Sequence, residues 1–415
     1  MMPMKRIAII GGGAAGLAAA AGALDAARKA ALGASVRVFE AGERIGRPVL
    51  ATGNGRCNFT NASIDASLYR NAGFVAEALE AFERAYPAGV HPNGVAAFFA
   101  QRGMLYREEG EGRLYPLANK ASVVLDVLRG ALQPEGGAAS FEACLEARVA
   151  AVDVPAAPGG HFTLRMSDGV LERADAVVVA CGGKVAQGML PDGFAFEPQR
   201  PVLCALATES TDVRELDNIR AKATVSLLRD ERIVASEAGE AMFRKYGLSG
   251  ICTFNLSRHA RPGDELSVDF LPFVAGAEAR SFAEGRLRQL QKVGGGALDC
   301  TGFLRGMVLP RVADVVLKRL RIDGGRTADA DRAMRLVAEL KDFRARVEGP
   351  GDAEHAQVRR GGFCVEDFRP ETLESKAQGG LHVVGEALDV DGPCGGYNLH
   401  WAFASGLMAG RACVS

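Results

Sequence analysis

The sequence lacks an excess of charge of either sign. Its 415 residues include 49 Lys and Arg against 50 Asp and Glu, which gives a formal net charge of −1 at pH 7. Proteins that bind nucleic acid through its phosphates usually carry a clear excess of positive charge. The balance therefore argues against a nucleic-acid partner and favours a small-molecule substrate.

Long hydrophobic runs are also missing. The first apolar run, residues 7–10, stops at three glycines, and residues 14–24 are mostly alanine and are followed by Asp25, Arg28 and Lys29. A membrane-spanning helix needs about 20 apolar residues, and a signal peptide needs an apolar core of about 7 to 15. We therefore expect a cytoplasmic protein without a membrane segment.

Cysteine motifs are absent as well. The nine cysteines form no C-x-x-C pair and no Cys/His cluster at the spacing of metal ligands. An odd number of cysteines without such patterns is typical of reduced thiols, not of a disulfide framework or a zinc site. We predict no metal site.

Glycine, by contrast, is abundant. The chain has 51 glycines, several of them in runs, and 48% hydrophobic residues. Glycine runs indicate loops in which the backbone approaches a ligand. The hydrophobic fraction is ample for a core, and the length exceeds what one core usually holds, which predicts two or three domains.

A dinucleotide-binding pattern opens the chain. Gly11, Gly13 and Gly16 form G-x-G-x-x-G between a buried-strand run and an alanine-rich helix. The first glycine permits the tight turn, the second lets a diphosphate approach the backbone, and the third lets helix and strand pack closely. Glu40 ends the next strand, where a carboxylate can bind both ribose hydroxyls and would repel a 2′-phosphate. The pattern predicts NAD or FAD and disfavours NADP.

Two further segments favour FAD. Residues 43–61 form a polar, glycine-rich loop that can run along a diphosphate and a ribityl chain. Near the C-terminus, Gly395 and Gly396 open a helix, and a helix N-terminus stabilises negative charge on a reduced flavin. Only one dinucleotide fingerprint is present, so we predict no dedicated NAD(P)H domain and leave NAD(P)H open as an external reductant.

Four motifs, at residues 11–16, 53–58, 239–250 and 385–410, resemble those of the aminoacetone oxidase family of FAD-binding enzymes, also called BaiN-like oxidoreductases. The resemblance extends over essentially the whole chain. It implies an α/β fold with a discontinuous, glutathione-reductase-type Rossmann domain that binds FAD, residues 1–190 and 350–415. An inserted α+β domain, β-barrel-like plus helical, would occupy residues 191–349 and cover the flavin.

The resemblance also implies a set of cofactor-binding residues, which would contact FAD from its adenine to its flavin ring. They are Gly11, Gly13, Ala15, Gly16, Glu40, Arg47, Arg56, Cys57, Asn58, Val149, Ala180, Gly182, Gly385, Glu386, Asp389, Gly396, Tyr397 and Asn398.

The implied activity is hydride transfer between flavin N5 and a small organic substrate of the amine or enone class. Two alternatives stay open: a flavin-dependent tRNA-modifying enzyme and a non-catalytic, FAD-binding redox sensor. The chain departs from the family at Arg359 and Arg360, which precede a glycine pair where the family more often has a small or hydroxyl residue. The oligomeric state stays open.

Four residues are candidates for a direct part in catalysis. His400 could donate a proton or be a packed histidine, and Arg360, with Arg359, could bind a substrate carboxylate or form a solvated pair. Cys57 is a single thiol where a redox disulfide would need two. Tyr246 lies in the 239–250 segment, which we interpret as a loop that presents aromatic surface to the flavin.

The inserted region shows its own periodicity. We expect strands at 202–208, 223–228 and 266–271, and helices at 277–293, 312–320 and 328–347, the last with Thr327 as its N-cap.

Overall fold

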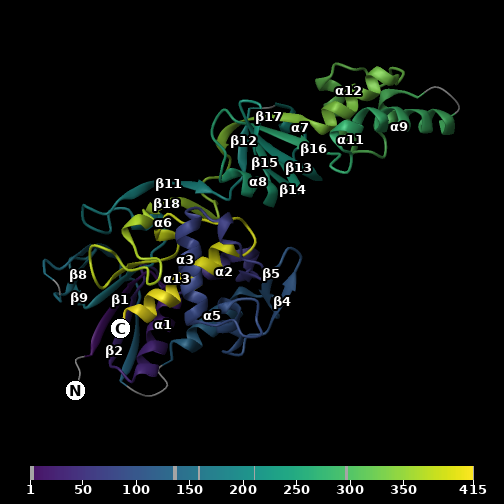
Figure 1. The fold of residues 1–415 in the computed structure, drawn as a ribbon. Coiled ribbons are helices and arrows are strands. Elements are labelled where there is room, and N and C mark those ends of the chain that lie inside the picture. Colours follow the sequence, from purple (N-terminus) through teal and green to yellow (C-terminus); the bar gives the residue numbers. More distant parts are fainter. Residues whose placement is uncertain (1–3, 134–137, 158, 210, 295–297, 415) are drawn as a thin grey trace. The chain divides into compact units, whose positions relative to one another are not determined.

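The computed structural model describes residues 4–133, 138–157, 159–209, 211–294 and 298–414. It divides into two compact units, which Figure 1 shows: residues 1–200 with 359–415, and residues 201–358. The chain leaves and re-enters the first unit through β11 (Phe196–Val202) and β18 (Val358–Phe363), which pair in a two-stranded sheet. The unit boundaries therefore fall inside these strands, later than the predicted residues 190 and 350.

The first unit is built on a five-stranded parallel sheet, which confirms the predicted α/β class. Its strands read, in spatial order, β19 (Leu381–Val383), β10 (Ala176–Val179), β1 (Lys5–Ile10), β2 (Ala34–Phe39) and β6 (Ala139–Cys144). Residues 7–10 of β1 and all of β10 are continuous, buried aliphatic runs, as is typical of a parallel sheet with both faces covered.

The remaining elements of this unit are helices and two small antiparallel sheets. They are α1 (Ala14–Ala30), α2 (Arg47–Ala51), η1 (Thr52–Gly55), β3 (Thr60–Asn61), η2 (Ala66–Leu68), α3 (Ala72–Ala85), α4 (Gly94–Ala100), β4 (Tyr106–Glu109), β5 (Arg113–Pro116), α5 (Ala121–Ala131), β7 (Val149–Asp153), β8 (Phe162–Met166), β9 (Leu171–Ala174), α6 (Gly183–Ala186), η4 (Val365–Asp367), η5 (Gly385–Ala387) and α13 (Tyr397–Ala412).

Helices α1 and α13 pack against each other unusually closely. A Cβ atom at Gly410 would lie 1.9 Å from the carbonyl oxygen of Ala19, and one at Gly406 would lie 2.3 Å from that of Ala15. The contacts pair residues in the same order along both helices, so the helices run in parallel. Their N-termini therefore point toward the same end of the unit, where β1 and β19 also end.

The second unit contains a closed six-stranded barrel. In spatial order its strands are β12 (Leu206–Thr208), β15 (Gly247–Ser249), β14 (Arg232–Arg244), β13 (Arg220–Arg229), β16 (Glu265–Asp269) and β17 (Phe343–Pro350). Its helices are α7 (Thr211–Glu215), α8 (Ile251–Ser257), η3 (Gly276–Glu278), α9 (Ala279–Gly294), α10 (Cys300–Leu304), α11 (Pro310–Arg319) and α12 (Ala330–Lys341).

The prediction of a helix over residues 328–347 was wrong for residues 342–347. Helix α12 starts after Asp329, not Thr327, because the Asp329 carboxylate accepts a hydrogen bond from the Arg332 N–H at 2.9 Å. The chain then becomes strand β17, in which Phe343 and every second residue to Val347 are buried. The strand-like alternation inside the barrel overrides the helical spacing of the same apolar residues.

We interpreted the 239–250 segment as a loop, and this prediction was wrong. The segment is the end of β14, a tight turn and β15. Phe243 is fully buried in the barrel and stacks on Phe270, so it presents no surface. Tyr246, at the turn, is 39% exposed.

Candidate functional site

The glycine-rich turn between β1 and α1 has the geometry that its spacing predicts. Gly11 has a φ of +106°, and a Cβ at Gly16 would lie 1.9 Å from the Gly11 carbonyl oxygen. A Cβ at Gly13, the N-cap of α1, would meet nothing within 4 Å. No side chain of the described residues caps this helix. The first turn of α1 therefore has no side-chain cap and open space beside Gly13, and its amides can hold an anionic diphosphate.

The Glu40 carboxylate is fixed beside this turn. Its Oε2 accepts a hydrogen bond from the Gly12 N–H at 2.9 Å, and its Oε1 accepts one from the Gly42 N–H at 2.7 Å. Each carboxylate oxygen can accept a second hydrogen bond. The two backbone N–H groups therefore orient the carboxylate, and each of its oxygens can still accept a hydrogen bond from a ribose hydroxyl.

The neighbouring expected residues lie at the ends of the adjacent strands. The Ala180 N–H donates to the Ile10 carbonyl at 2.9 Å, and Gly182 follows with a φ of +70°. Val149 is the first residue of β7, and the Ala147 N–H just before it donates to the Glu40 carbonyl at 2.8 Å. These contacts bring the ends of β1, β2 and β10 together with the start of the β7–β9 sheet.

In the 43–61 segment, Cys57 is a buried thiol. It is fully buried, with a φ of +58°, and burial raises its pKa to about 11. No disulfide joins any of the cysteines in the described residues. Arg47 is exposed at the start of α2. A thiol that stays protonated at neutral pH and has no partner cannot carry dithiol redox chemistry.

Arg56 is held by the β4–β5 hairpin. Its guanidinium lies 4.3 Å from the centre of the Tyr115 ring, its Nε donates to Asn119 Oδ1 at 2.5 Å, and it forms an ion pair with Glu109. The expected contact with FAD would have to use the remaining donors of a side chain that is already fixed.

The turn that opens α13 holds an unsatisfied acceptor. A Cβ at Gly396 would lie 2.5 Å from the Thr60 carbonyl oxygen and 3.0 Å from Asn58 Oδ1. Asn58 Oδ1 is buried and has no hydrogen-bond partner within the described part of the chain. A buried acceptor without a donor is costly, so this atom indicates a ligand that brings one. The residues here fit a flavin, whose ring carries an N–H.

Asn398 and Tyr397 shape this turn from inside. Asn398 Nδ2 donates to the Gly392 carbonyl at 2.9 Å, and its Oδ1 accepts from the Gly392 N–H at 2.8 Å. The Tyr397 hydroxyl donates to the Ser63 carbonyl at 3.1 Å. Both side chains therefore hold the loop that a flavin would contact, and do not project into open space.

Gly385 and Glu386 lie at the end of β19. A Cβ at Gly385 would lie 2.9 Å from the Ala15 Cβ, at the first turn of α1. Glu386 is partly buried, accepts a hydrogen bond from the Arg359 N–H, and has a pKa raised to about 7, chiefly because desolvation disfavours its charged form.

The residues after Glu386 form a buried ion-pair network. Both oxygens of Asp389 lie 2.7 Å from Arg70 Nε, and one accepts a hydrogen bond from the Gly361 N–H. Arg360 donates to both oxygens of Asp391, at 2.8 and 2.9 Å. The pairing takes up the edge of Arg360 that could otherwise bind a substrate carboxylate.

His400 does not have the properties of the expected proton donor. It is buried within α13, its Nδ1 lies 2.7 Å from Thr60 Oγ1, and burial lowers its pKa to about 3. A general acid must be protonated before it can donate, and His400 is neutral near pH 7. The packed-histidine alternative is the one that the structure supports.

Sequence reasoning missed several residues of this site. Asn61 Nδ2 donates to the Gly395 carbonyl at 2.9 Å, and Asn93 Nδ2 donates to the Asn61 carbonyl at 2.8 Å. Arg70 was missed in the same way. Asn61 ends the 43–61 segment that we expected to run along the cofactor, although it was not among the expected contacts. Asn93 and Arg70 belong to no pattern.

Tyr246 belongs to the second unit, so its role toward the flavin stays a prediction. No group of three or more His, Cys, Asp or Glu side chains that could hold a metal ion occurs among the residues that the structure describes. Over the same residues, no helix is long and apolar enough to cross a membrane.

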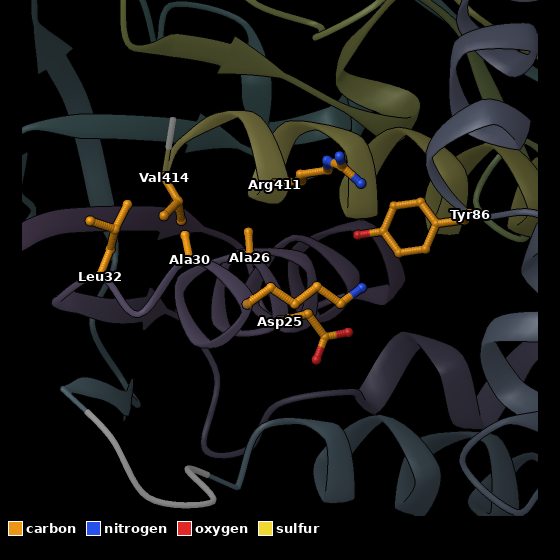
Figure 2. A pocket seen from close by; sticks show the side chains of 8 residues that line it. Asp25, Ala26, Ala30, Leu32, Tyr86, Arg411 and Val414 are labelled. Atoms are coloured by element: carbon orange, nitrogen blue, oxygen red, sulfur yellow. The ribbon is translucent and has the colours of Figure 1, made fainter.

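A cavity of about 290 Å³ lies away from these residues. Figure 2 shows Leu32 and Val414 at one end of it and Tyr86 and Arg411 at the other. It lies at the C-terminal end of α1, roughly 24 Å of helix from the diphosphate-facing turn. The cavity therefore takes no part in the site described above.

Comparison with known proteins shows the family to which the chain belongs. The family described as "HI0933-like protein Rossmann domain" matches residues 5–412. A 3-dehydro-bile acid delta(4,6)-reductase of Clostridium scindens is 33% identical, over 99% of this chain and 99% of that protein. A ribosomal RNA dihydrouridine synthase of Escherichia coli is 27% identical, over 98% and 97% of the two chains. The solved open conformation of a flavocytochrome c3 fumarate reductase covers 100% of this chain and 79% of that chain, with a TM-score of 0.42 and 14% identity.

Proposed function

Since the chain belongs to the HI0933-like family of FAD-binding oxidoreductases, we propose that it reduces a carbon–carbon double bond conjugated to a carbonyl group. The flavin would receive its electrons from NAD(P)H as an external reductant. The observation that carries the proposal is the joint geometry of the Gly11–Gly16 turn, Glu40 and the unsatisfied Asn58 Oδ1.

Each part of the site would have a distinct task in this reaction. Bound FAD supplies hydride transfer at N5. The first-turn amides of α1 would hold the diphosphate, and Glu40 would hold the adenosine ribose through its free lone pairs. Asn58 would accept a hydrogen bond from the flavin ring, and the N-terminus of α13 would stabilise negative charge on its pyrimidine edge.

The choice of an unsaturated carbonyl over an amine rests on the relatives. The first relative is named as a reductase of double bonds in a 3-dehydro bile acid, and the second as an enzyme that makes dihydrouridine. In both names the bond that is reduced is a C=C that can be conjugated to a carbonyl. Amine oxidation, the other class that we had expected, has no such support.

A flavin assay tests the proposal. Heat-released supernatant of the purified protein should contain FAD at about one equivalent. Anaerobic addition of NADH or NADPH should bleach the flavin, and α,β-unsaturated ketones should restore its absorbance faster than saturated ketones do. The proposal would be contradicted if neither unsaturated nor saturated ketones restored the flavin absorbance. It would also be contradicted if simple amines, and not NAD(P)H, bleached the flavin.

An RNA substrate is the second candidate function. The match to the ribosomal RNA dihydrouridine synthase favours it, so the expected absence of a nucleic-acid partner is not confirmed. The net charge of −1 argues for the small molecule, because phosphate contacts need an excess of cations. Many cations of the second unit are already paired, among them Arg344 with Glu231 and Lys318 with Glu215.

A binding experiment separates these two candidates. If RNA is the substrate, the protein should be retained on heparin at low salt, and unmodified ribosomal RNA should oxidise its reduced flavin. If the substrate is a small enone, the protein should pass through the column, and RNA should leave the reduced flavin unchanged.

A further inference from the structure

Glu386 stands where the negative charge of the cofactor is expected. The preceding residue, Gly385, packs against Ala15 in the first turn of α1. A Cβ at Gly182 would lie 4.0 Å from Glu386 Oε2. The carboxyl group therefore lies beside the turn that follows β10, and the preceding residue lies beside the turn that follows β1; the turns at these strand ends border the diphosphate in this fold.

The charged and titratable groups that face Glu386 do not neutralise it fully. Arg359 on β18 donates its backbone N–H to Glu386 Oε1 and attracts the carboxylate with its guanidinium. Asp391, in the loop after η5, opposes ionisation, although its own charge is paired with Arg360. Burial is the largest effect and raises the Glu386 pKa to about 7. The Cys181 thiol, at the end of β10, has a pKa raised to about 12 by burial and stays neutral.

A bound diphosphate would add two negative charges next to this carboxyl. Two anions that share a buried site disfavour each other's ionisation. We propose that Glu386 binds the FAD diphosphate as a neutral carboxylic acid, which takes one proton from the solvent as the cofactor enters and donates a hydrogen bond to a diphosphate oxygen. The inference rests on the proposed FAD function and adds the charge state of this one residue.

If FAD binding is coupled to the uptake of a proton by Glu386, the Kd for FAD must depend on pH. Below about pH 7 the free protein already holds the proton, so FAD affinity does not depend on pH. Above about pH 7 the free carboxyl is ionised, and binding must take up a proton. The Kd for FAD should then rise by up to about tenfold for each pH unit. We expect FAD to bind at least about tenfold more weakly at pH 9 than at pH 6.

The test compares three proteins freed of flavin: the natural chain, Glu386→Gln, and Glu77→Gln as a control at an exposed carboxylate of α3. Gln keeps a hydrogen-bond donor in place but cannot ionise. Titration with FAD, followed by flavin fluorescence from pH 6 to 9, should show the pH dependence in the natural chain and Glu77→Gln and none in Glu386→Gln. Calorimetry at pH 8 in two buffers of different ionisation enthalpy should show uptake of most of one proton, except in Glu386→Gln.

The outcomes separate this inference from the function it rests on. A natural chain that binds FAD equally well from pH 6 to 9, or without proton uptake, overturns the inference and leaves the FAD assignment intact. The same holds if Glu386→Gln keeps the pH dependence. If the natural chain binds no FAD at any pH, both proposals fail. The proton count on the natural chain decides the matter even if Glu386→Gln does not fold.

Discussion

His400 and Thr60 share a buried hydrogen bond that joins α13 to β3, with 2.7 Å between Nδ1 and Oγ1. Both residues are at most 2% exposed. Asn93 Nδ2 approaches the same hydroxyl at 3.4 Å, and the edge of the Phe82 ring packs near the imidazole. The histidine thus belongs to the scaffold under the Gly396 turn. Its protonation state matters for stability and not for proton donation.

The first prediction concerns acid stability. Burial lowers the pKa of His400 in the folded state to about 3, while in the unfolded chain it is near 6.5. The unfolded state therefore binds a proton below about pH 6.5 that the folded state does not. Stability is complete above that pH and falls as the solution becomes more acidic. The loss between pH 7 and pH 5 should be roughly 2 kcal/mol from this residue.

Urea denaturation of the natural chain and His400→Gln at both pH values checks this prediction. His400→Gln should be less stable at pH 7 but should lose less stability on acidification. His355 is a matched control, because it is exposed on the surface and pairs with Asp352. His355→Gln should lose at least as much stability as the natural chain, because Asp352 raises the pKa of His355 and protonation of this residue favours the folded state. A loss in His400→Gln equal to that of the natural chain would show that another group is responsible.

A second prediction concerns the ribose contact. Glu40→Ala should weaken FAD binding by roughly 1.5 to 3 kcal/mol, because it removes charge-assisted hydrogen bonds to ribose and leaves the Gly12 and Gly42 amides unpaired. The exposed Glu43, three residues further, provides the control Glu43→Ala. Titration of flavin-free protein with FAD measures both changes, and equal Kd values would show that Glu40 does not reach the ribose.

The first βαβ unit was the most predictable part of the molecule. Its strand, turn, helix and acidic residue are contiguous, and each is specified by local chemistry: an aliphatic run, glycines with room for a diphosphate, and a carboxylate after Phe39. The structure confirms the strand–turn–helix geometry and the position of Glu40. The FAD contacts of these residues stay predictions, as do those of Val149 and Arg47.

The parts that sequence could not predict depend on distant partners. Arg56 was expected to contact FAD, and Arg360 was a candidate for binding a substrate carboxylate. The structure pairs them with Glu109 and Asp391, over 53 and 31 residues of chain, which no local pattern indicates. Phe343 and Val347 fit the apolar stripe of a helix by their spacing, and only the closure of the barrel makes this segment a strand. Local patterns indicate which residues are polar or apolar, and long-range pairing decides what each side chain does.

A third prediction concerns Cys57. Cys57→Ser should keep the turnover per bound FAD within about tenfold, because one buried thiol cannot form a catalytic disulfide. The variant should melt at a lower temperature, since the serine hydroxyl loses its water and needs a partner in a buried site. Turnover normalised to flavin absorbance, with a thermal melt of the same sample, separates the two effects. Full loss of turnover with FAD still bound would make the thiol a direct participant.

The last prediction concerns the contact between α1 and α13, which aligns the two helix N-termini that we propose to face the cofactor. Gly410→Ala would place a Cβ 1.9 Å from the Ala19 carbonyl oxygen, a backbone atom that cannot move aside. The helices must separate, so we expect a loss of roughly 1 to 3 kcal/mol in stability together with weaker FAD binding. Gly130→Ala is the matched control, because this exposed glycine of α5 has nothing within 4 Å of its Cβ position. The control should gain about 0.4 to 1 kcal/mol by restricting the unfolded chain, with an unchanged Kd for FAD. Denaturation and FAD titration of both variants test the contact; equal stability would show that α13 can shift without cost, and that the close packing does not position the site.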